Sequence, residues 1–206
     1  NTALFPRDAA TPSDDYEQRI RASYPLHPEL LDRLYEDWST LERFQRTRGV
    51  LKLVSSIVHE LWASNDTSPL ILPSNVPLEA TTVNTDLTQY LEDQWKPIID
   101  SDIDGPGSMA QQIDLDRPNL GQRFVTQRIA RTIFMGAAPR IKASRKGLDK
   151  QYVWLGTAAP GDTLAVRILD MTPHLPYGSN CAANWGLFYS TFGKERAGMV
   201  FGWVFA

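Results

Sequence analysis

Residues 24–53, YPLHPELLDRLYEDWSTLERFQRTRGVLKL, contain two stretches with helical spacing that are joined by a short polar segment. In the first stretch, Pro28 suits the first turn of a helix, where its missing N–H costs nothing. Apolar residues then recur at helical spacing and predict one buried stripe, formed by Leu30, Leu31, Leu34, Tyr35 and Trp38. The intervening charged residues are expected on the solvent side, namely Glu29, Asp32, Arg33, Glu36 and Asp37. Glu29 and Arg33 stand four residues apart in the favourable order for an ion pair.

A second helix is expected to begin near Thr47, a residue suited to the N-cap. It carries a wide apolar face formed by Val50, Leu51, Val54, Ile57, Val58, Leu61 and Trp62. Two amphipathic helices joined by a short connection bury their apolar faces against each other. Residues 24–66 are therefore predicted to form a helical bundle.

The remaining chain is predicted to contain further helices and a few extended segments. Helices are expected after Ser13 or Asp14, from about Thr85 until Pro97, and from about Asn119 onward. The last of these should place Phe124, Val125, Ile129 and Ile133 inward and Arg123, Gln127 and Arg131 outward. We expect a short strand at 70–72, a polar loop at 99–119, and a hairpin whose strands are 175–177 and 187–191.

Composition restricts the class of protein. The chain has 206 residues and a formal net charge of -3, which is too small to draw the whole molecule to nucleic acid or to an anionic membrane. The single cysteine, Cys181, excludes an internal disulfide and fits a reducing cytoplasm. Apolar stretches stay well short of the roughly 20 residues of a spanning helix, so we expect a cytoplasmic protein without a membrane partner. The first residue, Asn1, and the apolar end, GMVFGWVFA, indicate a fragment of a longer protein.

Motifs for nucleotide or metal chemistry are incomplete. The segment GLFYSTFGKE at 186–195 lacks the glycine spacing and the hydroxyl residue of a phosphate-binding loop. The run DSDIDG at 100–105 begins like a calcium loop, but Gln111 stands where a bidentate carboxylate is required. His59 and Glu60 begin a zinc-protease pattern that Ala63 breaks. We therefore expect no catalytic residue and no metal or cofactor bound by this chain alone, and we expect His27 to fix the YPLHP turn.

Arg46 and Arg48 lie at the start of the second helix, where a cation is disfavoured by about 0.3–1 kcal/mol unless an anion is near. Helix N-termini and arginines together bind phosphate. One interpretation is a nucleotide phosphate held by a neighbouring domain. The alternative is an ion pair with Glu42 or Asp37, or simple solvation.

A basic stretch occupies the second half of the chain: Arg123, Arg128, Arg131, Arg140, Lys142, Arg145, Lys146 and Lys150. Such clustering suits nucleic-acid phosphates, especially if the following hairpin forms the wing of a winged helix. The predicted nucleic-acid contacts are Arg123, Arg131, Arg140, Lys142, Arg145 and Lys146. The alternative is a solvated helix face with a loop packed against acidic neighbours.

The run at 24–53 resembles the signature of the AAA-type ATPases of domain-of-unknown-function family number 499. The similarity continues through SPLILPSNVPLE, LEDQWKPIIDSDIDGPGS, RIARTIFMGAAP and RKGLDKQYVWLGTAAPGD, and it decays after about Asp162. The resemblance implies a large bacterial protein that binds ATP and magnesium in an upstream core and works beside DNA methyltransferases and helicases in anti-phage defence. It also implies that Arg48, with Arg46 beside it, is the lid arginine that senses the terminal phosphate.

The resemblance divides the chain into an entry segment at 1–23, a helical lid at 24–66, a winged-helix-like region at 67–162 and a divergent tail with the wing hairpin at 163–206. The expected fold is mainly α, a helical lid bundle followed by a winged-helix-like α+β region with a small hairpin. Our leading hypothesis is the lid and winged-helix portion of an AAA-type ATPase, which couples ATP use in an upstream core to a DNA-linked partner. The alternative is a stand-alone winged-helix module that binds DNA or protein without nucleotide.

Overall fold

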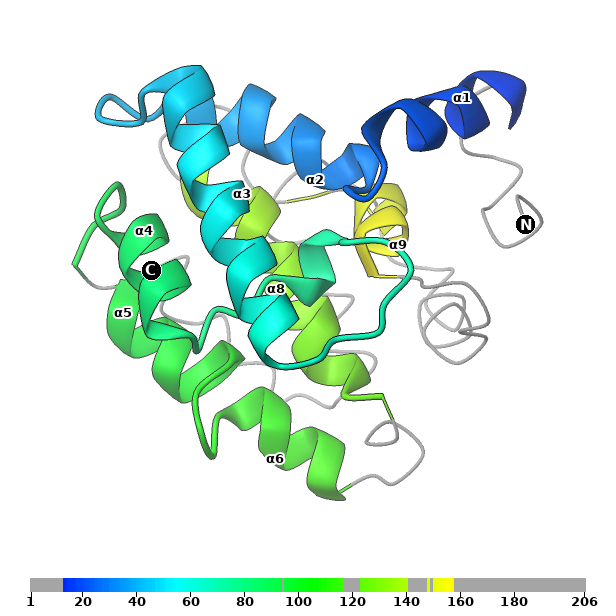
Figure 1. The fold of residues 1–206 in the computed structure, drawn as a ribbon. Coiled ribbons are helices and arrows are strands. Elements are labelled where there is room, and N and C mark those ends of the chain that lie inside the picture. Colours follow the sequence, from blue (N-terminus) through cyan, green and yellow to red (C-terminus); the bar gives the residue numbers. More distant parts are fainter. Residues whose placement is uncertain (1–12, 94, 117–122, 141–147, 149, 158–206) are drawn as a thin grey trace.

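The computed structural model of the protein describes residues 13–93, 95–116, 123–140, 148 and 150–157, and helices provide nearly all of their regular structure (Figure 1). The α-helices are α1 (Ser13–Ser23), α2 (Pro28–Asp32), α3 (Arg46–Ala63), α4 (Thr81–Thr88), α5 (Trp95–Ile98), α6 (Met109–Asp116), α8 (Val125–Ala137) and α9 (Lys150–Thr157). Two π-helical turns, η2 (Arg33–Asp37) and η5 (Ile99–Ile103), and three 3-10 turns, η3 (Trp38–Thr40), η4 (Pro73–Asn75) and η6 (Ala138–Arg140), complete them. The mainly helical expectation is confirmed, whereas the hairpin predicted at 175–191 lies outside the described residues.

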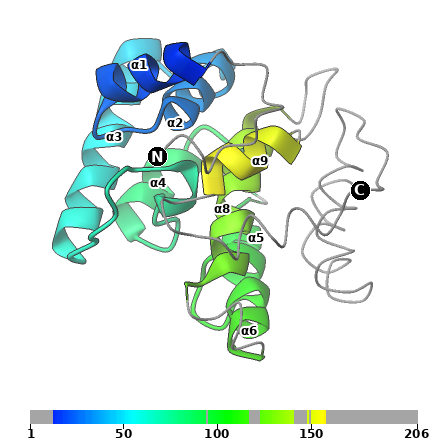
Figure 2. The same ribbon diagram turned by 90° about the vertical axis from the view of Figure 1, so that its right-hand side faces the viewer.

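Helix α8 lies in the middle of the helical body, with the other helices around it (Figures 1 and 2). Nearly all of its residues are buried. Val125, Ile129 and Ile133 are buried as predicted, and Arg123 is exposed. The predicted division into an inward and an outward face fails at two positions, because Gln127 is buried and Phe124 is 50% exposed. The helix begins at Val125 rather than near Asn119, and the carboxylate of Asp114 on α6 accepts hydrogen bonds from the backbone N–H groups of Thr126 (2.9 Å) and Gln127 (3.1 Å).

Small residues let α9 approach α8 closely. A Cβ atom on Gly156 would lie 2.6 Å from Cγ2 of Thr132, too close for a real contact. The hydroxyl of Thr132 donates to the Gly156 carbonyl at 3.1 Å and lies 3.0 Å from the hydroxyl of Thr157. This short α8–α9 contact brings α9 over the helix that begins at Pro28.

The helix that begins at Pro28 continues through α2, η2 and η3 to Thr40. Leu30, Leu34 and Trp38 are fully buried, as their spacing predicts, and the indole N–H of Trp38 donates to the Met135 carbonyl at 2.8 Å. Tyr35, however, is 47% exposed, because the core contacts a narrower stripe than expected.

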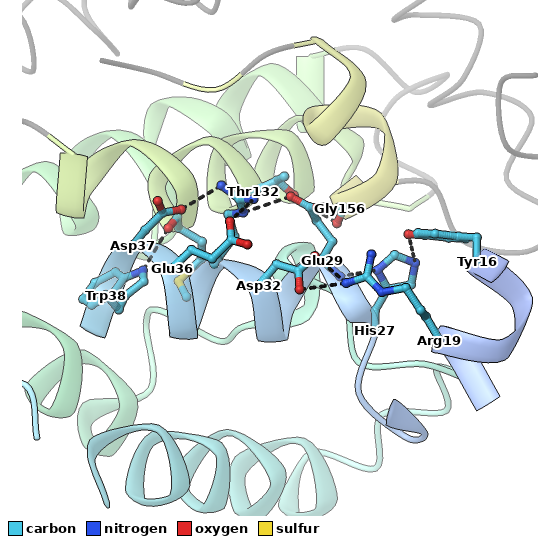
Figure 3. Close-up of polar contacts among 12 residues, drawn as sticks. Tyr16, Arg19, His27, Glu29, Asp32, Glu36, Asp37, Trp38, Thr132 and Gly156 are labelled. Carbon is cyan, nitrogen blue, oxygen red and sulfur yellow. Dashed lines mark hydrogen bonds and ion pairs between the residues drawn. The ribbon is translucent and has the colours of Figure 1, made fainter. Parts of the chain in front are cut away.

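The side of this helix that was expected to face solvent is largely buried, which is the largest difference between the prediction and the structure. Glu29, Arg33 and Asp37 are buried, because α8 and α9 cover this side. Figure 3 shows the polar side chains between the helix and α8 and α9. Asp37 compensates the buried guanidinium of Arg33, whose Nη1 donates to Oδ2 of Asp37 at 2.7 Å. Nε of Arg33 also lies 3.0 Å from Oε1 of Glu29, although these two atoms make no hydrogen bond. The guanidinium of Arg33 also lies 4.9 Å from the ring centroid of Tyr152 on α9.

Helix α3 packs against η2 and η3, so the predicted pairing of the first two helices is confirmed. Val50, Leu53 and Ile57 form its buried face. The wide apolar face that was predicted is divided, since Leu51, Val58 and Trp62 are exposed on the other side. The structure thus leaves an apolar stripe of α3 in solvent.

Three local predictions need correction. Residues 70–72 form no strand, and Ile71 makes an isolated parallel bridge with Leu26. Pro97 lies in the first turn of α5 instead of ending a helix, which suits a residue that lacks a backbone N–H. The segment 99–119 contains η5 and α6, so much of the predicted polar loop is helical.

A shared core connects the described helices. Its buried side chains come from both sides of the boundary predicted between residues 66 and 67, for example Leu53, Leu87 and Ile129. The division into lid and winged-helix-like regions stays a prediction. Among the described residues, no helix combines the length and the apolar character required to span a lipid bilayer.

Candidate functional site

The start of α3 is held by the short loop before it. Backbone N–H groups of Leu41 and Phe44 donate to the carbonyls of Trp38 (3.1 Å) and Leu41 (2.9 Å). The buried ring of Phe44 makes an edge contact with Tyr90 at a centroid distance of 5.0 Å. A Cβ atom at Gly49 would approach this ring to 3.1 Å, so a glycine suits this position although it weakens a helix by about 1 kcal/mol.

The N-terminus of α3 has no side-chain cap. Gln45 at the N-cap position makes no side-chain capping hydrogen bond, and the first turn contains no acidic residue. Within the described part of the chain, the backbone N–H groups of Thr47 and Arg48 have no acceptor. Two amide donors and the positive end of the helix dipole therefore face an open region.

An open pocket of about 490 Å³ lies beside this helix start. Its lining residues are Arg43, Gln45, Arg48, Gly49, Lys52, Gln89 and Tyr90. Of the two arginines predicted to contact nucleotide, Arg48 lines the pocket, whereas Arg46 is exposed outside the lining. The structure adds Arg43 from the preceding loop and Lys52 from the next turn of α3.

The charges around the pocket are unequally compensated. Nζ of Lys52 lies 2.7 Å from Oδ1 of Asp86, and Ser56 donates to the same carboxylate at 2.7 Å. Burial opposes ionisation of Asp86, but the hydrogen bonds from Lys52 and Ser56 outweigh it and lower the pKa of this carboxyl. Arg43 and Arg48 have no ion-pair partner among the residues that the structure describes.

The ion-pair alternative for the arginines at this helix start is not seen within the described residues. Asp37 is engaged by Arg33, and no ion pair joins Glu42 to Arg46 or Arg48. Both arginines are exposed. Solvation or an external anion remains as the source of their compensation.

A second cavity of about 650 Å³ adjoins the first and shares Arg43, Gln89 and Tyr90 with it. Its other lining residues are Thr40, Leu41, Glu42, Leu91, Glu92, Trp95, Ala138 and Pro139. The turn between α4 and α5 separates the cationic pocket from this more apolar cavity. Sequence spacing could not reveal this arrangement, because Gln89 and Tyr90 reach α3 through tertiary packing.

The basic stretch is only partly described. Arg131 is used inside the protein: its Nε donates to Oδ1 of the fully buried Asp104 at 2.7 Å. Arg128 donates to the Thr157 carbonyl. Arg123 is exposed, the side chain of Arg140 is not described, and Lys142, Arg145 and Lys146 lie outside the described residues.

His27 is a structural residue, as its place in the YPLHP turn predicts. Its Nδ1 accepts a hydrogen bond from the backbone N–H of Glu29 at 3.2 Å and caps α2. Its Nε2 lies 3.4 Å from the hydroxyl of Tyr16 (Figure 3). Among the described residues, no group of three His, Cys, Asp or Glu side chains can hold a metal ion.

Comparison with protein families gives one match. The family model described as DUF499 second domain matches residues 9–146, which include every residue lining the two pockets. Comparisons with curated proteins and with solved structures give no match.

Proposed function

The chain belongs to the DUF499 family, whose second-domain model matches most of its length, and we propose that it is the lid and coupling domain of an AAA-type ATPase. In this proposal ATP is bound by a core in another domain, and the present chain contacts the terminal phosphate. The description of the family as a second domain supports a role beside another domain. The chain itself is proposed to be non-catalytic.

The observation that carries the proposal is the pair of uncompensated guanidinium groups at an uncapped helix start. Arg43 and Arg48 both line the pocket, and the free N–H groups of the first turn lie at the same end of α3. Phosphate oxygens accept hydrogen bonds from guanidinium and amide donors and carry the charge that this end of a helix favours. A terminal phosphate therefore fits the donors present.

Magnesium fits this site poorly. The pocket is lined by cationic, amide and aromatic side chains, whereas Mg²⁺ prefers carboxylate and water oxygens. We assign magnesium to the core domain, and we derive no step through it here. Arg48 would hold the phosphate by charge and hydrogen bonding alone.

Coupling would follow from the way α3 is fixed to its neighbours. Leu53 and Ile57 anchor α3 in the core, and the contacts of Lys52 and Ser56 with Asp86 join it to α4. A phosphate that pulls on Arg48 would therefore move α3 and α4 as one unit. We propose that such a movement reports the nucleotide state to the rest of the protein.

Steady-state ATP turnover tests this role in the protein that carries both the core and this domain. Arg48→Ala removes a charge-assisted hydrogen bond worth about 1.5–3 kcal/mol, so kcat/KM for ATP should fall roughly 10- to 100-fold. Arg21→Ala is the matched control, because Arg21 is an exposed arginine on α1 that pairs with Glu17. Unchanged turnover in the Arg48 variant would remove the lid-arginine role.

DNA and its methyltransferase or helicase partners, together with a role in anti-phage defence, form the remaining part of the proposal. Arg131 is left out of the charge reversal, because its guanidinium pairs with the buried Asp104. Charge reversal at Arg140, Lys142, Arg145 and Lys146 should lower the slope of log K against log salt by about 0.9 for each phosphate that the variant no longer neutralises. Duplex binding with an unaltered slope would contradict the DNA-binding role.

A further inference from the structure

Helix α3 carries a second apolar stripe on the side opposite its buried face. Leu51, Val58 and Trp62 are 63%, 40% and 85% exposed. Arg48 and Ser55 are exposed on the same side, which gives the spacing 48, 51, 55, 58 and 62. This alternation of three and four residues is the pattern of a helix that packs along another helix. Figures 1 and 2 show α3 at the outside of the helical body, where such a partner has access.

We propose that this stripe is the contact surface between two copies of the chain, in which the two α3 helices pack antiparallel about a twofold axis at Ser55. The stripe is self-complementary about that residue. Arg48 and Trp62 stand seven positions before and after Ser55, while Leu51 and Val58 stand four before and three after. An isologous contact requires this kind of symmetry, since each residue meets its counterpart from the other end.

The chemistry of the paired positions supports the antiparallel direction. Arg48 of each copy would lie over the exposed indole of Trp62 in the other, and a guanidinium over an indole face is a favourable cation–π contact. Leu51 would meet Val58, and the small side chain of Ser55 would let the helices approach. A parallel pair would instead place Arg48 against Arg48.

The proposed contact is small and should therefore be weak. The stripe from Arg48 to Trp62 spans about 21 Å along the helix axis. One helix pair of this length covers less than the roughly 800 Å² per partner of a standard interface. We expect dimerisation that depends on protein concentration. The apolar part of the contact is separate from the cationic pocket, because Leu51, Val58 and Trp62 are not in its lining. Arg48 belongs to both the pocket and the proposed dimer contact, so dimerisation is measured in the absence of nucleotide.

Sedimentation velocity of the 206-residue chain from about 10 µM to about 1 mM tests whether the surface is used. The wild type should shift from monomer to dimer over this range. Trp62→Ser should raise the dissociation constant at least about tenfold, because each copy loses the ring that Arg48 of the other contacts, and tryptophan is enriched among the residues that dominate binding. Tyr24→Ser is the control, since Tyr24 is 68% exposed on the turn between α1 and α2. A wild type that stays monomeric, or a Trp62 variant that dimerises like the wild type, would overturn the proposal.

Oxidative cross-linking tests the direction of packing. In a Cys181→Ser background, Ser55→Cys should form a disulfide-linked dimer, because facing Cα atoms of two close helices lie within about 6 Å. Leu51→Cys should not, since the two Leu51 positions are about eight residues apart along the antiparallel pair, or about 12 Å. Cross-linking of the Leu51 variant as fast as the Ser55 variant would refute the twofold arrangement.

Discussion

Replacing His27 by asparagine should change the pH dependence of folding stability. His27 is fully buried, and its Nδ1 accepts the Glu29 N–H, so Nε2 carries the proton of the neutral ring and points it toward the Tyr16 oxygen. Burial lowers the pKa of His27 from 6.5 to about 4. Asparagine keeps a capping acceptor for α2 but removes the titrating group.

The sign and magnitude follow from the two pKa values of His27. The unfolded chain takes up a proton near pH 6.5, whereas the folded chain does so only near pH 4, so the stabilisation is complete above pH 6.5 and is lost as the pH falls toward 4. The difference in pKa corresponds to about 3 kcal/mol in favour of folding at high pH. Wild type should therefore lose stability relative to His27→Asn as the solution is acidified.

Comparison with the variant is needed because Glu29 titrates in the opposite sense. Burial raises the pKa of Glu29 from 4.5 to about 8, so this group stabilises the fold at low pH and loses that effect as the pH rises toward 8. Urea unfolding gives the free energy of unfolding of both proteins at several pH values between about 4.5 and 7.5. The Glu29 contribution is present in both proteins and largely cancels in the difference between these free energies. A difference that does not vary with pH would refute the assignment of a buried neutral imidazole.

Three further substitutions test the packing by urea unfolding. Gly105→Ala should lower the free energy of unfolding by more than about 3 kcal/mol, because the new Cβ would lie 2.1 Å from the Asp100 carbonyl oxygen. Gly107→Ala has open space around the new Cβ and should cost about 1–2 kcal/mol for its φ of +76°. Equal costs for the two variants would contradict the close approach of Gly105 to the Asp100 backbone. Asp114→Ala should cost about 1–3 kcal/mol, because the amides at the start of α8 lose their acceptor, and an unchanged midpoint would contradict that cap. Arg131→Met should lower the free energy of unfolding by about 3–5 kcal/mol, because it leaves the buried Asp104 carboxylate without its cation. Adding Asp104→Asn to this variant should recover part of the lost stability. A double variant as unstable as Arg131→Met would argue against the ion pair.

Local periodicity predicted the helices well where one face meets the core. The stripe of Leu30, Leu34 and Trp38 is buried as expected. Glu29 and Arg33 show the limit, because their row has the same spacing as the apolar row and its burial depends on α9, which lies far along the chain. A charged row can be buried when its members compensate one another, and sequence alone does not reveal the covering element.

The sequence likewise predicted only the part of the candidate site that depends on local structure. The helix start with Arg48 was visible in the sequence because caps and dipoles are local. Arg43 and Tyr90 were missed, since their place beside the pocket depends on the packing of Phe44 and of the turn after α4. The split of the apolar residues of α3 between core and solvent was also missed, because two apolar faces on one helix give the same composition as one wide face.

The affinity of the ATPase for ATP and for ADP, measured with wild-type and Arg48→Ala protein, tests most directly whether α3 contacts the terminal phosphate. We expect the variant to bind ATP about 10- to 100-fold more weakly, because one charge-assisted hydrogen bond is removed, and to bind ADP within about twofold of the wild type. An equal weakening for both nucleotides, or unchanged ATP affinity, would contradict the proposed contact between Arg48 and the terminal phosphate.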